Sequence, residues 1–182
     1  MNSLEYLKTT AKLMAELRIA VRDTFSFDSV AEPGIGQLNI EWIETDGFTE
    51  MKSKYCKVPG RKSMGYESAN IRVPARFREC GRDDVIVHEC VHFLQHNTLE
   101  EDRQYIQFSG PNYVNYLSQR VELEAHLIQV AYLSKGNSEH WNSRMDEGSK
   151  AVVATMLDKV RHGEPLAGAL PTLLMCKGRG LL

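Results

Sequence analysis

The sequence predicts an α+β domain in which a helix precedes a short, mostly antiparallel sheet, and further helices follow the sheet. In the first 24 residues, and again from position 83 onward, apolar residues recur every three or four positions, as in amphipathic helices. Between them, residues 37–77 contain stretches in which apolar and polar residues alternate, as in half-buried strands. The length of 182 residues fits a single domain, 1–182.

The N-terminal helix is expected over residues 1–24, where Asn2 and Glu5 can form a capping box. The β region has three strand candidates, at 37–43, 52–58 and 69–77. Proline lacks the N–H that a sheet ladder needs, so Pro74 places the third strand at an edge of the sheet or ends it. The sequence therefore predicts an edge strand directly before the next helix.

Three helical segments are expected after the sheet, namely 83–97, 112–134 and the C-terminal part, 138–182. Asp83 can cap the first of them, and Asp84 adds negative charge to its first turn. The end of the chain is apolar and is broken by Pro165 and Pro171, which predicts a short helix or a packed extension there.

The overall charge of −2 gives no general attraction to nucleic acid or to a membrane. Residues 52–82 are locally basic, with nine Lys or Arg against two Glu, which could contact a phosphate backbone or protect an exposed strand edge. The first residues lack the pattern of a secretory signal, and no apolar run is long enough to span a membrane. We therefore expect a cytoplasmic protein with reduced cysteines.

The stretch "VIVHECVHFLQH", residues 85–96, contains three of the six histidines of the chain. On a helix, its apolar residues gather on one side, whereas His88, Glu89, His92 and His96 gather on the other. Residues four apart are neighbours on a helix, so His88 and His92 can direct ring nitrogens at one Zn²⁺ ion. Glu89 can then accept a proton from a water molecule that the ion activates, which is the chemistry of the HExxH motif.

A catalytic zinc site needs a third protein ligand, and the residues alone leave several candidates open. The pattern HExxHxxGxxH fails, because Gln95 and Thr98 stand at its Gly and third His positions. The candidates that remain are His96, Glu122, Glu124, His126 and His140. On a helical wheel Glu122 and Glu124 lie nearly opposite each other, so only one of them can reach the ion.

The motif "HECVHFLQH", followed by "YLSQRVELEAHLIQVAYL" at 116–133, resembles the gluzincin clan of zinc metallopeptidases, in particular the compact minigluzincins and the ImmA/IrrE-type peptidases of phages and mobile elements. The resemblance covers about residues 69–133. It implies a small zincin-like domain in which Glu122 is the third ligand and Ala125 lets the second helix approach the first. The sequence departs from the family at His126, where an Asp or Asn orients a zinc-bound histidine.

Two further features bear on catalysis and substrate. Tyr113 and Tyr116 either place a hydroxyl near the metal, where it could stabilise an oxyanion, or only pack in the core. The edge strand predicted at 69–77 could hold an extended peptide by strand addition.

The sequence thus predicts a zinc-dependent metallopeptidase that hydrolyses peptide bonds through a metal-activated water, with His88, His92 and Glu122 as ligands and Glu89 as general base. Its partner would be a protein or peptide substrate. One alternative is a SprT-like protease acting on DNA-bound proteins, for which His140 before Trp141 would be the third ligand and the basic segment 52–82 would contact DNA. Another alternative is a zinc-binding regulatory module without catalysis.

Overall fold

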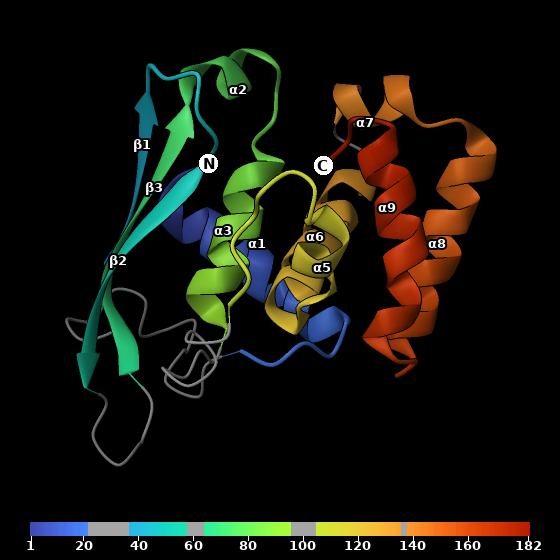
Figure 1. Cartoon of the computed structure of the whole chain (residues 1–182), viewed down its shortest axis with the longest axis horizontal. Helices are drawn as coiled ribbons and strands as arrows, with labels where there is room; N and C mark the ends of the chain where they lie inside the picture. The colour runs from blue at the N-terminus through green and yellow to red at the C-terminus, as the bar shows by residue number, and fades with distance from the viewer. Residues whose placement is uncertain (22–36, 58–63, 96–104, 136–137) are drawn as a thin grey trace.

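The computed structural model describes residues 1–21, 37–57, 64–95, 105–135 and 138–182, and it confirms the α+β class. A helix is followed by a three-stranded sheet, and the remaining described chain is helical. In Figure 1 the sheet lies at one side, α3 and α6 lie next to each other in the middle, and α7, α8 and α9 lie at the other side. The two central helices carry the residues of interest.

The sheet consists of β1 (Gln37–Ile43), β2 (Glu50–Lys57) and β3 (Met64–Pro74), in the order β1-β3-β2. β3 lies between the other two, parallel to β1 and antiparallel to β2. The register pairs Ile40 with Ile71 on one side of β3 and Met51 with Ile71 on the other. Ile71 and Val73 are fully buried, because helix α3 packs against this strand.

Two expectations about the sheet are wrong. The strand before the HExxH helix is the central strand and not an edge, and the sheet is mixed and not mostly antiparallel. Pro74 is the last residue of β3, where its missing N–H costs the ladder only a terminal hydrogen bond. A proline at the end of a strand is therefore compatible with a central position.

The N-terminal helix, α1 (Ser3–Glu16), begins with the expected capping box between Asn2 and Glu5. It is shorter than expected, because Arg18 adopts a left-handed conformation with φ 57°. The N–H groups of Arg18 and Ile19 turn back to carbonyls of the last helical turn, which ends the helix. Residues 22–24 of the expected helix lie outside the described residues.

The helices after the sheet are shorter and more numerous than expected. The short α2 (Ala75–Glu79) precedes α3 (Asp84–Leu94), which carries HExxH. The segment 112–134 forms two helices, α5 (Tyr113–Ser118) and α6 (Arg120–Ser134), because the backbone of Gln119 is extended, with ψ 135°. The remaining elements are α7 (Glu139–Arg144), α8 (Glu147–Arg161), the 3-10 helix η2 (Leu166–Ala169) and α9 (Leu170–Gly178).

α3 and α6 pack against each other in opposite directions in the centre of the molecule. The end of α3 meets the start of α6, since Gln95 donates to the carbonyl of Val121, and Asp84 at the start of α3 meets Gln129 farther along α6. α1 packs against both helices. No helix in the described part of the chain is both long and apolar enough to span a membrane.

Candidate metal centre

Helix α3 has the two-sided character that the sequence predicts. One side is fully buried in the core and consists of Ile86, Val87, Cys90, Val91 and Leu94. His88, Glu89 and His92 lie on the other side, where they are only partly buried. The helix is therefore anchored by its apolar side and presents its imidazoles and its carboxylate to a partly open region.

The start of α3 is held by side chains rather than by the expected cap. Asp83 occupies the N-cap position but makes no capping hydrogen bond. Its Oδ2 instead accepts hydrogen bonds from the hydroxyls of Tyr6 (3.1 Å) and Tyr132 (2.6 Å). Asp83 thus joins α1, α3 and α6 and fixes the position of α3 relative to its two neighbours.

Helix α6 brings Glu122 to the two histidines of α3. Every residue of α6 from 122 to 131 is buried, and Glu122 is only 1% exposed. One ligand atom from each of His88, His92 and Glu122 lies within 4.8 Å of the others, so these residues form a group that could hold a metal ion. The two imidazoles approach the carboxylate at 3.3 Å, from His92 Nε2 to Oε1, and at 3.5 Å, from His88 Nε2 to Oε2.

The hydrogen bonding of this group fits a bound cation. Each ligand imidazole has its Nδ1 near a glutamine oxygen, Gln129 Oε1 for His88 (3.2 Å) and Gln95 Oε1 for His92 (2.9 Å). An amide oxygen only accepts, so each Nδ1 carries a hydrogen, and the two Nε2 atoms, 3.1 Å apart, are the ring atoms left to bind a cation, either a proton or a metal ion. Glu122 Oε2 is buried and has no hydrogen-bond partner among the described residues. A buried carboxylate oxygen normally has a partner, and a metal ion beside the two Nε2 atoms would supply one.

Glu122 and His92 each shift the pKa of the other. Burial alone would raise the pKa of Glu122, but the charge of His92 and hydrogen bonds with His88 and His92 outweigh burial and hold this pKa far below its usual range. Burial would likewise lower the pKa of His92, but the charge of Glu122 and their hydrogen bond raise it to about 9. Glu122 is therefore an anion, and it attracts a positive charge to the space beside the imidazoles.

Glu89 lies beside this group, next to His88 in the helix. Burial is the main cause that raises the pKa of Glu89, and it outweighs the neighbouring His88 and His92, which lower it. The carboxylates of Glu122 and Glu50 raise it further. Glu50 is the first residue of β2, so the charge at the start of this edge strand acts on Glu89.

The other third-ligand candidates have different partners. Glu124 accepts from Gln95 and pairs with Arg120, and His140 Nε2 lies 3.0 Å from the carbonyl oxygen of Gly180. His126 donates from Nδ1 to the backbone carbonyl of Glu122 (2.8 Å), so this nitrogen is not available to orient His88 by a hydrogen bond. The His126 ring contacts the His88 ring edge-on. Gln129 makes that hydrogen bond instead. His96 lies outside the described residues.

A tyrosine that the sequence analysis missed contacts the candidate ligand directly. The hydroxyl of Tyr105 donates to Glu122 Oε1, and its ring packs edge-on against Tyr116. Burial, followed by the charge of Glu122, raises the pKa of both Tyr105 and Tyr116, so both hydroxyls keep their protons. Tyr113 is different, because its buried hydroxyl has no hydrogen-bond partner among the described residues. Tyr105 lies in a segment without regular secondary structure, so no periodicity in the sequence indicated it.

Aromatic rings continue from Tyr105 and Tyr116 to the surface. Phe108 lies 5.6 Å from Tyr116 between ring centroids, and Phe48 lies 6.3 Å from Phe108 and is 77% exposed. The loop that carries Phe48 is held by Arg76, whose guanidinium donates to the carbonyl groups of residues 45, 46 and 47. We call these four rings (Tyr105, Tyr116, Phe108 and Phe48) the aromatic row.

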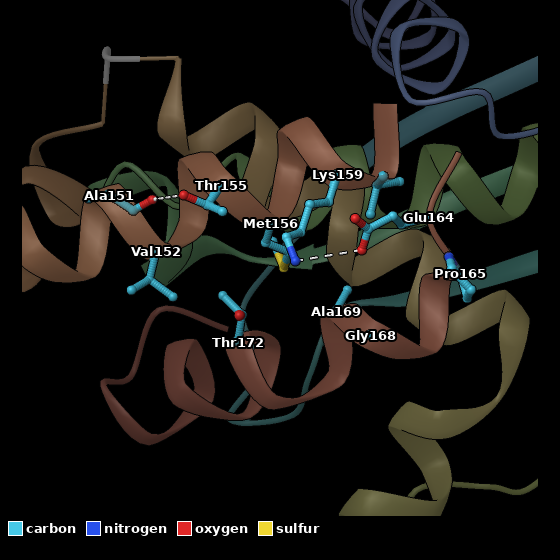
Figure 2. Close-up of a pocket in the computed structure, with 11 residues that line it drawn as sticks. Ala151, Val152, Thr155, Met156, Lys159, Glu164, Pro165, Gly168, Ala169 and Thr172 are labelled. Atoms are coloured by element: carbon cyan, nitrogen blue, oxygen red, sulfur yellow. Dashed lines mark hydrogen bonds and ion pairs between the residues drawn. The ribbon is translucent and has the colours of Figure 1, made fainter. Parts of the chain in front are cut away.

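A separate groove lies between α8 and the η2–α9 segment (Figure 2). Its lining contains one ion pair, between Lys159 and Glu164 at 3.6 Å, together with small and apolar side chains such as Val152 and Ala169. No residue that lines it belongs to the His88–His92–Glu122 group. The groove therefore gives no support to a second metal site.

Comparisons with protein-family models, with curated proteins and with solved structures give no match for this chain. The functional assignment therefore depends on the geometry of the candidate metal centre and on the chemistry of its residues.

Proposed function

We propose that this protein is a zinc-dependent metallopeptidase. The observation that carries the proposal is the convergence of two imidazole Nε2 atoms and a buried carboxylate, one oxygen of which has no hydrogen-bond partner among the described residues. Two histidines and a glutamate are a ligand set of catalytic zinc sites, which keep a fourth position open. The side chains of His88 and His92 are 12% and 15% exposed, so the group is accessible from one side.

In this proposal, His88, His92 and Glu122 hold the ion, and Glu89 moves the proton. A zinc ion in such a site supplies Lewis acidity and lowers the pKa of a water molecule toward about 7. Glu89 takes the proton of the attacking water and later gives it to the nitrogen of the leaving amine. The raised pKa of Glu89 suits both steps, because it makes the carboxylate a stronger base than an exposed glutamate.

The surrounding residues support an extended peptide as the substrate. Within the described part of the chain, β2 is an edge strand, and the charge of its first residue, Glu50, acts on Glu89. A peptide that pairs with β2 would take the role expected of the 69–77 strand. The aromatic row offers apolar contacts on the way to the metal centre. The hydroxyl groups of Tyr105 and Tyr116 are protonated donors that could stabilise negative charge on a carbonyl oxygen.

The decisive experiment combines metal analysis with a peptide-library cleavage assay. Wild type should contain about one zinc per chain and cleave peptides, as a site with three protein ligands and an open position allows. Glu89→Gln should keep the metal and lose at least about 100-fold in rate, because a positioned general base contributes about 10²–10⁴-fold. Glu122→Ala should lose the metal, whereas His140→Ala should keep it.

A metal-loaded wild type that cleaves no peptide would contradict the peptidase proposal and favour a regulatory zinc module. A Glu89→Gln variant with full activity would contradict the assigned mechanism. Activity that appears only with added DNA and falls steeply with salt would instead indicate a protease that acts on DNA-bound proteins.

A further inference from the structure

Two glutamines, Gln95 and Gln129, lie directly behind the candidate ligands and are almost completely buried, at 3% and 4% exposure. Gln95 follows the end of α3 and contacts His92 Nδ1, whereas Gln129 belongs to α6 and contacts His88 Nδ1. Each imidazole therefore has its own glutamine, and the two glutamines come from different elements.

The far end of each side-chain amide determines its orientation. Gln129 Nε2 lies 2.7 Å from Asp84 Oδ2, and Gln95 Nε2 lies 2.8 Å from the carbonyl oxygen of Val121 and 3.1 Å from Glu124 Oε2. These neighbours only accept hydrogen bonds, so the NH₂ group must face them and the amide oxygen must face the imidazole.

Each carboxylate at the far end is paired with an arginine. Arg82 makes two hydrogen bonds to Asp84 (2.8 and 3.0 Å), and Arg120 makes one to Glu124 (2.8 Å). The result is two matching chains of hydrogen bonds, from imidazole to glutamine to carboxylate to arginine. One crosses from α3 to α6 at the start of α3, and the other crosses at its end.

We propose that Gln95 and Gln129 are positioning residues that fix both imidazoles with the hydrogen on Nδ1 and the lone pair of Nε2 toward the metal. This inference rests on the metal-binding part of the proposed function. Only an amide suits these positions, because it accepts from the imidazole at one end and donates to a carboxylate at the other. A glutamate would face a second carboxylate, and a leucine would leave the imidazole N–H and the carboxylate without partners.

The first test is the zinc dissociation constant, measured by chelator competition. Gln95→Leu and Gln129→Leu should each weaken zinc binding about 10-fold or more, as is typical when a hydrogen-bond partner of a metal ligand is removed. Gln119→Leu is the matched control, because Gln119 bonds the backbone of Ile106 and no ligand imidazole. It should bind zinc within about 3-fold of wild type, against the 10-fold or larger loss on removing a ligand's partner.

The second test exchanges donor and acceptor between Gln129 and Asp84 in the hydrogen-bond chain behind His88. Gln129→Glu alone should weaken zinc binding, since the introduced carboxylate would face that of Asp84 across a distance of hydrogen-bond length. Gln129→Glu combined with Asp84→Asn and Arg82→Met should restore part of the lost zinc binding, because the new amide donates to the new carboxylate, which still accepts from His88. Arg82 is removed as well because its guanidinium donates to the same oxygen of Asp84 as Gln129 does and would face the new NH₂ group. A role in packing alone would not produce this rescue.

A third measurement needs no variant, so it remains valid if a substitution unfolds the protein. In zinc-loaded, ¹⁵N-labelled wild type, the ring N–H of His88 and of His92 should be on Nδ1. Ring hydrogens on Nε2 would overturn the proposal, as would glutamine variants that bind zinc as well as Gln119→Leu does, or a triple variant without any rescue. If wild type binds no metal, the proposed function itself fails, which is a different result.

Discussion

Glu122 is a buried anion at the start of α6, and its charge determines which cation occupies the space beside the imidazoles. Without a metal, the raised pKa of His92, about 9, means that a proton on this ring balances the carboxylate at neutral pH. A metal ion and this proton therefore compete for the same lone pair.

We expect zinc binding to release one proton from His92 at every pH below about 9. Because one proton must leave His92, the apparent affinity should fall about 10-fold for each unit that the pH drops between about 8.5 and about 7. Chelator competition at a series of pH values measures this slope, and calorimetry in buffers of different ionisation enthalpy counts the protons. An affinity that stays constant over this range would contradict the coupling between Glu122 and His92.

At the scale of elements, α3 could be predicted from the sequence and α6 could be predicted only in part. α3 has one buried and one partly open side, so its apolar residues indicated both the helix and the face that carries His88 and His92. α6 is buried on all sides from 122 to 131, so its periodicity could not separate Glu122 from Glu124. The resemblance to gluzincins favoured Glu122, and the packing of α6 against α3 brings that residue to the imidazoles.

The glutamine and tyrosine partners could not be predicted because they depend on contacts between elements. Gln129, and not His126, is the hydrogen-bond partner of the His88 ring, because the Nδ1 of His126 is bonded to the backbone of its own helix. Tyr105 reaches Glu122 from an irregular segment. The central position of β3 was also not predictable, because a terminal proline has the same local sequence in an edge strand and in a central one.

The hydrogen bonds that Asp83 at the start of α3 accepts from Tyr6 of α1 and Tyr132 of α6 give a prediction about stability. Tyr132→Phe should lower the free energy of unfolding by about 1.5–3 kcal/mol, because it removes a hydrogen bond to a charged group. Tyr113→Phe is the control, because the hydroxyl it removes is buried without a partner among the described residues, so this change should be neutral or stabilising. Denaturant unfolding of both variants tests the comparison, and equal losses of stability would contradict the role given to Asp83.

At the scale of the whole molecule, the candidate metal centre joins the two helices on which the rest of the fold packs. α3 also contacts the sheet and α1, and α6 also contacts α5, α8 and α9. An ion held by His88, His92 and Glu122 would therefore link both halves of the molecule. Because the unfolded chain has no such preformed site, the free energy of metal binding adds to the free energy of folding.

Zinc should consequently raise the midpoint of thermal unfolding. At a free zinc concentration about 100 times the dissociation constant, the expected stabilisation is about 2.7 kcal/mol. For a chain of this size, that corresponds to a rise of about 5–10 °C, which a chelator should reverse. Calorimetry with and without zinc measures the shift. Glu89→Gln should retain it, because Glu89 holds no metal in this arrangement, whereas Glu122→Gln should lose most of it. A shift that persists in Glu122→Gln would mean that zinc binds elsewhere on the chain.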